Sequence, residues 1–252
     1  MKRKRLIAVI NIKDDLVVQS FNYKRYLPLG SPEFFLENYN RWGADEILIQ
    51  SIDSSKVRAP NFKIIKRISD IGISTPIVYA GGIFTAKDAV NVIKLGADRI
   101  ILGSAFFSNP EIIKQISDSI GSQAIIISLP FLIEKNNRIF FFDYLNQKYH
   151  PFEYINFNII SEKYVSEILL SDVKNEGMNE AFDAKILKIK EFYNIPFILF
   201  GGISSKKQID FLIRKKNVSA IAISNFLSYK EHAYQLFKQN SKNYFRPSYF
   251  HL

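Results

Sequence analysis

Two glycine pairs recur along the chain with matching neighbours. Gly81-Gly82 in "YAGGIFT" precedes Gly201-Gly202 in "LFGGISS" by 120 residues, and the same spacing separates Ser104 from Ser224. Glycine lets an anion approach backbone N–H groups closely, and a nearby hydroxyl adds a donor. One such pair is explained equally well by a tight turn, but two with matching serines favour a ligand with a phosphate at each end. The predicted phosphate sites are Gly81, Gly82, Gly103 and Ser104, and Gly201, Gly202, Ser224 and Asn225.

Short apolar runs alternate with amphipathic segments and must position these glycines. The runs are rich in Ile, Val, Leu and Phe without alternation, which is typical of parallel strands buried on both faces. Strands are expected at 5–11, 46–51, 76–80, 99–103, 124–129, 167–171, 196–200 and 219–224. Helices are expected at 32–43, 85–97, 109–121 and 205–217. Their expected N-caps are Ser31, Thr85, Asn109 and Ser204 or Ser205, and Gly43, Gly96 and Gly121 should end helices.

Eight strand-helix units in 252 residues predict an α/β fold, a (β/α)8 TIM barrel in a single domain 1–252. A doubly wound open sheet is the alternative, but the usual G-x-G-x-x-G after its first strand is missing. The repeat at 120 residues predicts two half-barrels, about 1–122 and 123–252. The segment 131–157 exceeds a standard connection, and its alternating aromatics around "KNN" predict a hairpin over the top rim.

The amino-acid composition excludes several kinds of site and partner. The absence of cysteine excludes disulfides and thiolate catalysis, and it is compatible with a cytoplasmic location. His150, His232 and His251 lack metal-ligand spacing, so no metal and no cofactor is expected. The net charge of +10 comes from lysines scattered along helices without a nucleic-acid motif, so we expect no nucleic acid partner. The longest apolar run, 124–133, is too short to span a membrane.

Several motifs together carry a family resemblance. They include "RLIAVINIKDDLVVQSFNY", "GADEILIQSID", "GADRIILGSA" and "SEILLSDVKNEGMNEAFD". Over nearly its whole length the chain resembles the cyclase subunit of imidazole glycerol phosphate synthase, the HisF-like family. The related amidophosphoribosyl isomerase barrels share twin phosphate sites but not "GSQAIIIS" followed by a hairpin. "PNFKIIKRI" with "PIVYAGGI" is more similar to a branch that serves surface-sugar amidination than to the histidine-pathway enzyme.

The resemblance implies two catalytic carboxylates, one after the first strand and one after the fifth, which act as general acid and base. This sequence has Asn11 and Pro130 at those positions, and Gln19 replaces the lysine of a mobile loop. Neither an amide nor a proline side chain transfers protons as a carboxylic acid does. Standard cyclase chemistry is therefore predicted to be lost, unless a carboxylate from elsewhere substitutes. The candidate substitutes are Asp53, Asp172 and Glu176.

The resemblance also implies a ring of four charges at the bottom of the barrel, where a glutaminase docks and ammonia enters. The matching residues are Arg5, Glu46, Arg99 and Glu167, with Asp98 beside them. The alternative is that these charges form stabilising ion pairs at strand starts, as many barrels do.

Three functions follow from these features. The favoured one is a HisF-like subunit that docks a glutaminase and conducts ammonia through the barrel, for amidination of a sugar held by a third protein. The second is an active cyclase (a lyase) of histidine biosynthesis whose acids have moved. The third is a non-catalytic barrel that binds a phosphorylated small molecule.

Overall fold

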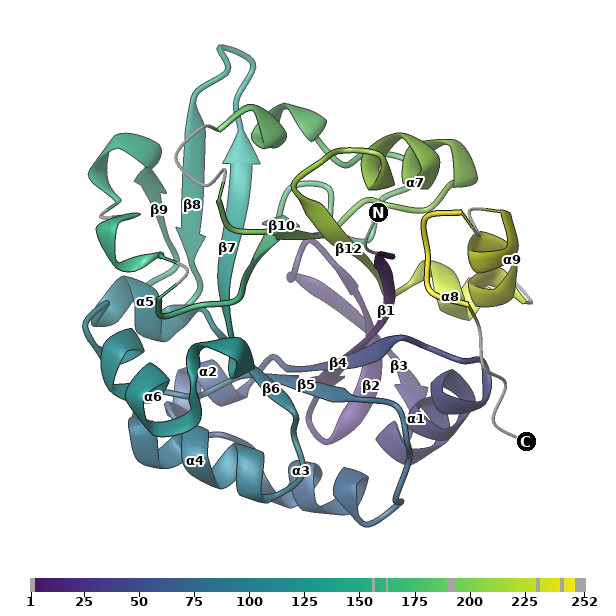
Figure 1. Ribbon diagram of the computed structural model, residues 1–252, viewed down its shortest axis with the longest axis horizontal. Coiled ribbons are helices and arrows are strands. Elements are labelled where there is room, and N and C mark those ends of the chain that lie inside the picture. The colour runs from purple at the N-terminus through teal and green to yellow at the C-terminus, as the bar shows by residue number, and fades with distance from the viewer. Residues whose placement is uncertain are drawn as a thin grey trace.

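The computed structural model describes residues 3–155, 157–161, 163–189, 194–229, 232–240 and 243–247, so His251 lies outside the described residues. Eight parallel strands form a closed barrel (Figure 1). In order around the barrel they are β1 (Arg5–Lys13), β4 (Glu46–Ser51), β5 (Ile77–Ala80), β6 (Arg99–Leu102), β7 (Ile125–Ile133), β10 (Glu167–Asp172), β11 (Phe197–Phe200) and β12 (Val218–Ile223). Pairing of β10 with β7 and of β12 with β1 closes the barrel and confirms the predicted fold.

Each barrel strand is apolar throughout because it is buried on both faces. In β4, Ile47 and Ile49 pack toward the helices, whereas Leu48 points into the barrel interior. Successive side chains of a strand alternate between its two faces, so one run supplies both cores. The interior core, called the lumen below, consists of Ile7, Val9, Leu48, Val78, Ala80, Ile101, Ile126, Leu169, Ile198, Phe200, Ala220 and Ala222.

Helices surround the barrel on its outer face (Figure 1). The longer ones are α1 (Pro32–Arg41), α3 (Phe62–Ser69), α4 (Ala86–Lys94), α6 (Ile112–Ile120), α7 (Lys206–Ile213) and α9 (Ala233–Asn240). Short helices α2 (Ser54–Val57), α5 (Ser104–Ser108) and α8 (Phe226–Tyr229) follow strand ends. Single 3-10 turns occur at Ser122–Ala124, Phe152–Tyr154, Phe157–Ile159 and Ala184–Lys188.

Most of the expected helix boundaries agree with the structure. Ser31 and Thr85 cap α1 and α4, and Ser205 rather than Ser204 caps α7. The expected cap at Asn109 is wrong, because α6 begins at Ile112. Asn109 instead ends α5, where its backbone N–H donates to the Ala105 carbonyl at 2.8 Å.

Two hairpins stand at the upper, carboxyl end of the barrel. β7 continues beyond the barrel and pairs with β8 (Ile139–Asp143), which pairs with β9 (Lys148–Pro151), so the predicted hairpin is confirmed. A second hairpin, β2 (Leu16–Phe21) with β3 (Arg25–Gly30), follows β1 and was not predicted. Its turn places Asn22 and Tyr23 at positive φ without the glycine that usually signals such a turn. Among the described residues, no helix is long and apolar enough to cross a membrane.

Candidate active site and charge ring

The first half of the barrel carries a cavity of about 440 Å³ at its upper end, called the first-half cavity here. Its wall brings together all four residues of the first predicted phosphate site, Gly81, Gly82, Gly103 and Ser104. Three lysines and one aspartate also line it, which gives a formal charge of +2. These charged residues are Lys13, Lys24, Lys56 and Asp53. The cavity is therefore suited to an anion.

Tyrosines form a second wall of the first-half cavity. Tyr23 and Tyr26 come from the β2–β3 hairpin, and Tyr144 follows β8. The rings of Tyr23 and Tyr144 meet edge to face with centroids 5.1 Å apart. Tyr23 donates its phenolic hydrogen to Gln50 Oε1 at 3.3 Å, and Tyr26 donates to the Tyr23 carbonyl at 2.6 Å. Burial raises the pKa of Tyr23, so this wall consists of neutral phenols.

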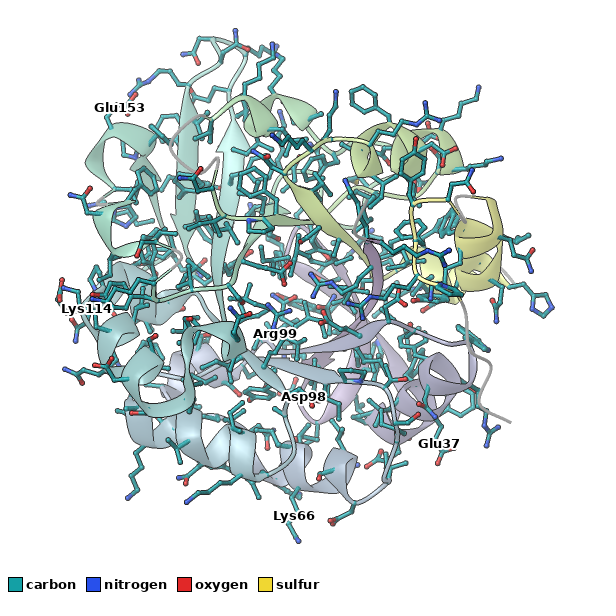
Figure 2. All side chains as sticks on the ribbon, viewed as in Figure 1. Glu37, Lys66, Asp98, Arg99, Lys114 and Glu153 are labelled. Carbon is teal, nitrogen blue, oxygen red and sulfur yellow. The ribbon has the colours of Figure 1, made fainter. Side chains whose placement is uncertain are left out.

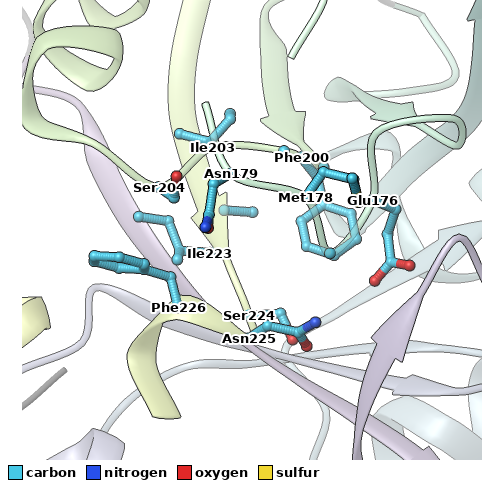
Figure 3. A pocket seen from close by; sticks show the side chains of 14 residues that line it. Glu176, Met178, Asn179, Phe200, Ile203, Ser204, Ile223, Ser224, Asn225 and Phe226 are labelled. Atoms are coloured by element: carbon cyan, nitrogen blue, oxygen red, sulfur yellow. The ribbon is translucent and has the colours of Figure 1, made fainter. Parts of the chain in front are cut away.

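The second half of the barrel carries a much smaller cavity of about 30 Å³, the second-half cavity. Gly201, Gly202, Ser224 and Asn225 line it together with Glu176 (Figure 3). The structure thus brings the second predicted phosphate site together as well. However, the only charged side chain among the described residues of this lining is the carboxylate of Glu176.

Polar side chains of the second-half cavity are bonded within the protein. Asn225 donates its amide to the Ser20 carbonyl at 2.6 Å, and its Oδ1 accepts from the Ser20 N–H at 3.2 Å. We call this pair of bonds the Asn225 latch. It fastens the β2–β3 hairpin to the second half. Ser224 accepts a hydrogen bond from the Asn11 amide at 3.2 Å.

Glu176 also holds the hairpin. Its Oε2 accepts from the Ser20 hydroxyl at 3.0 Å and from the Tyr23 N–H at 3.1 Å. The residue is 1% exposed, and this burial raises the pKa of its carboxyl to about 7. Next to it, Gly177 has φ +79°, and a Cβ there would overlap the Ser20 carbonyl oxygen. The hairpin therefore packs directly on residues 176–177.

Close backbone contacts also require glycine at both pairs, and the sequence did not reveal these contacts. A Cβ on Gly82 would overlap the Ala59 carbonyl oxygen, and one on Gly81 would lie 2.5 Å from the Ser51 carbonyl oxygen. In the second half, a Cβ on Gly201 would lie 2.6 Å from the Asp172 carbonyl oxygen. Each pair allows its strand end to pack against the preceding unit, with or without a ligand. Phosphate binding therefore remains a prediction.

The positions of the two implied carboxylates lie within the barrel strands. Asn11 on β1 is fully buried, and Pro130 on β7 lies opposite Ser171 of β10. Gln19 is buried on β2, opposite Leu27 of β3. None of these three side chains ionises.

The candidate substitute acids differ in their surroundings. Asp53 lines the first-half cavity and accepts a hydrogen bond from the Asp14 N–H at 2.8 Å. Asp172 accepts from the Asn175 amide at 2.8 Å and from the Asp183 N–H at 2.9 Å, so it holds its own loop together. Burial raises the pKa of Asp172. Glu176 faces the hairpin, as described above.

At the opposite end of the barrel four buried charges contact one another in a closed ring, the charge ring. Arg5 pairs with Glu46 at 2.8 Å and with Glu167, while Arg99 pairs with the same two carboxylates at 3.3 and 2.6 Å. Burial opposes ionisation of Glu167, but Arg5 and Arg99 hold the pKa of its carboxyl below the ordinary value. Figure 2 shows Arg99 near the centre of the view, with Lys66, Lys114 and Glu153 around the periphery. Asp98 lies beside the ring, but its carboxylate accepts from the Ile77 N–H at 2.8 Å.

Known proteins are similar to this chain over most of its length. The family described as histidine biosynthesis protein matches residues 5–233. The chain belongs to this family. It is 30% identical over 246 residues to a putative imidazole glycerol phosphate synthase subunit hisF2 of Vibrio vulnificus (strain YJ016), which covers 96% of this chain and 90% of that protein. It is 29% identical over 247 residues to the imidazole glycerol phosphate synthase subunit HisF of Staphylococcus saprophyticus, with 96% and 97% covered. The predicted resemblance to HisF-like chains is therefore confirmed.

Sequence reasoning missed the cationic and aromatic residues of this HisF-like chain. Tyr23, Lys24 and Tyr26 stand in the short segment "NYKRY" at 22–26. Their clustering in a polar segment about ten residues after the predicted first strand was the available signal. Because the β2–β3 hairpin was not predicted, nothing indicated that they return over the barrel mouth.

Proposed function

We propose that this HisF-like chain docks a glutaminase at its charge ring and conducts ammonia through the lumen, without the two-carboxylate chemistry of ring closure. The proposal is supported by Asn11 and Pro130, which stand where the resemblance implies the two proton-transferring carboxylates. Both lie in the sheet, and Asn11 is bonded to Ser224. An amide and a proline ring cannot replace the acid and the base.

The charge ring supports the docking role. Four charges with 8–14% of each side chain exposed are held at the strand starts, where mutual pairing and hydrogen bonds to Ser166 and Ser219 compensate their desolvation. Above them the lumen is lined by apolar side chains, which would favour neutral ammonia over ammonium. The similarity of 60–68 and 76–83 to the surface-sugar branch leads us to propose sugar amidination as the reaction served, with the sugar held by a third protein.

A second candidate is an active cyclase that uses Glu176. Its pKa of about 7 would suit proton transfer at neutral pH. Its Oε2, however, is already bonded to Ser20 and Tyr23, and little space lies beside it.

The test is ammonium-dependent turnover of the histidine-pathway cyclase substrate by the purified chain, beside the double variant Asn11→Asp with Pro130→Asp. We expect no turnover from the unchanged chain and measurable turnover from the double variant, if the two missing acids are the only barrier. Turnover by the unchanged chain that disappears in Glu176→Gln would replace the proposal by the second candidate.

Docking is tested separately, by titrating the chain into a glutaminase of the imidazole glycerol phosphate synthase type. We expect complex formation and faster glutamine hydrolysis. The variant Arg99→Gln, which removes one charge of the ring, should weaken both effects. Lys94→Gln, an exposed lysine on α4, is the matched control and should change neither. A chain that neither binds nor stimulates the glutaminase would contradict the docking role.

A further inference from the structure

We propose that the ligand of this chain is a monophosphate ester with a polar ring, such as a sugar monophosphate, held in the first-half cavity alone. The two glycine pairs suggest a grip on two phosphates, but the two cavities differ in size, charge and closure. The inference goes beyond the proposed function and does not depend on it, because the sugar to be amidinated is there held by a third protein.

Charge separates the two cavities. Three lysines and Asp53 line the first-half cavity. Among the described residues that line the second-half cavity, Glu176 alone carries a charge. Lys56 precedes Glu176 by 120 residues, the same interval that separates the glycine pairs. At corresponding positions, one half therefore presents a cation and the other presents a buried acid. A second phosphate would be repelled by Glu176 when it is ionised.

The two cavities also differ in how the β2–β3 hairpin is fastened beside them. Ala105 precedes Asn225 by the same 120 residues. Ala105 has no polar group to hold a hairpin, so the first-half cavity stays open toward its lysines. Asn225 forms the latch to Ser20, and opening room for a phosphate there would break both bonds of the latch. The hairpin is thus fastened directly beside the second-half cavity, through a residue of its lining.

The first-half cavity has the size and lining for a small phosphorylated ring. Its volume of about 440 Å³ lies within the usual range of small-molecule sites. Tyr23 and Tyr26 offer aromatic surface, and Gln50 and Ser128 offer polar groups that suit hydroxyls. Ile101 and Leu169 line this cavity and also belong to the lumen, so a bound ring would lie directly above the lumen.

The test is calorimetric titration of the isolated full chain, without glutaminase, at fixed ionic strength. The probes are ribose 5-phosphate, ribose, inorganic phosphate and ribose 1,5-bisphosphate, which keeps the same furanose ring and adds one phosphate. We expect ribose 5-phosphate to bind at least about tenfold more tightly than ribose or inorganic phosphate, because the lysines and the polar wall act together. The second phosphate of ribose 1,5-bisphosphate should add less than about threefold.

Variants locate the site. Lys24→Gln with Lys56→Gln should weaken ribose 5-phosphate binding by about tenfold or more. Two controls should leave it unchanged, Lys94→Gln on α4 and Asn179→Ala in the lining of the second-half cavity. A tenfold gain from the second phosphate, lost in Asn179→Ala, would overturn the proposal. So would equal affinity for ribose 5-phosphate and inorganic phosphate, or an undiminished affinity in the lysine variant. Since no partner is present, these outcomes are independent of the docking test.

Discussion

The upper ends of the two half-barrels share a backbone plan but have opposite surroundings. Both strand ends carry a glycine pair at positive φ that packs against the preceding unit. One end opens into a cationic cavity of about 440 Å³, while the other is fastened under a hairpin and leaves about 30 Å³. The repeated glycines therefore maintain the packing of the barrel, whereas a few other side chains determine whether a ligand cavity at the strand end is open.

The largest expected effect tests the packing role of the glycines. Gly82→Ala should lower the free energy of unfolding by about 3–5 kcal/mol, because its Cβ would overlap the Ala59 carbonyl oxygen. Gly202→Ala should lose less, about 1–3 kcal/mol, since its Cβ would lie 2.9 Å from the Asn175 carbonyl oxygen and the Phe182 nitrogen, a smaller overlap that adds to the strain at positive φ. Urea denaturation measures both losses.

Gly72→Ala is the control for this pair of variants. Gly72 has φ +69°, the same as Gly82, but nothing lies within 4 Å of its Cβ position. A loss for Gly82→Ala no larger than that for Gly72→Ala would show that close packing is not what requires the glycine.

The next largest effect is a pH dependence of stability caused by Glu176, the acid that distinguishes the second-half cavity from the cationic first-half cavity. Burial raises the pKa of this carboxyl from its ordinary 4.5 to about 7. Between these values the folded protein keeps a proton that the unfolded chain releases, so the contribution of this group to stability is full below pH 4.5 and is lost as pH rises to 7. This group should contribute a loss of about 3 kcal/mol across that window. Chemical denaturation at several pH values, compared with Glu176→Gln, isolates this contribution.

In this series Glu176→Gln should lose less stability between pH 5 and 8 than the unchanged protein. The control is Lys56→Gln, at the corresponding position of the first half, which should keep the pH profile of the unchanged protein. Parallel profiles for Glu176→Gln and the unchanged protein would contradict a raised pKa at this site.

The smallest effect tests the closure of the second half. Asn225→Ala removes two hydrogen bonds to Ser20 and should lower the free energy of unfolding by about 1–2 kcal/mol. Hydrogen exchange of the β2 amides should accelerate, whereas Asn179→Ala, with an exposed side chain nearby, should change neither quantity. Unchanged exchange in β2 would mean that the other contacts of the hairpin, with β1 and with residues 174–177, hold it without the latch.

The fold could be predicted because continuous apolar runs and helix caps are local signals. β4 occupies the predicted 46–51, and Thr85 caps α4 as expected. The β2–β3 hairpin was missed since its turn at Asn22-Tyr23 lacks the usual glycine. The predicted site residues do meet in space, but their different surroundings depend on contacts such as Ser20 with Asn225, which are 205 residues apart. No local pattern reports such a contact.

The Asn225 latch also orders the assembly of the protein during synthesis. Ser20 leaves the ribosome long before Asn225 does, since domains emerge from the amino terminus. The lining of the first-half cavity comes from residues 13–147 apart from Leu169, so most of that wall can assemble early. The hairpin must wait for its final contact until β12 has been made. Pairing across such a long stretch of chain is slow, and we expect hairpin docking to be among the last steps of folding.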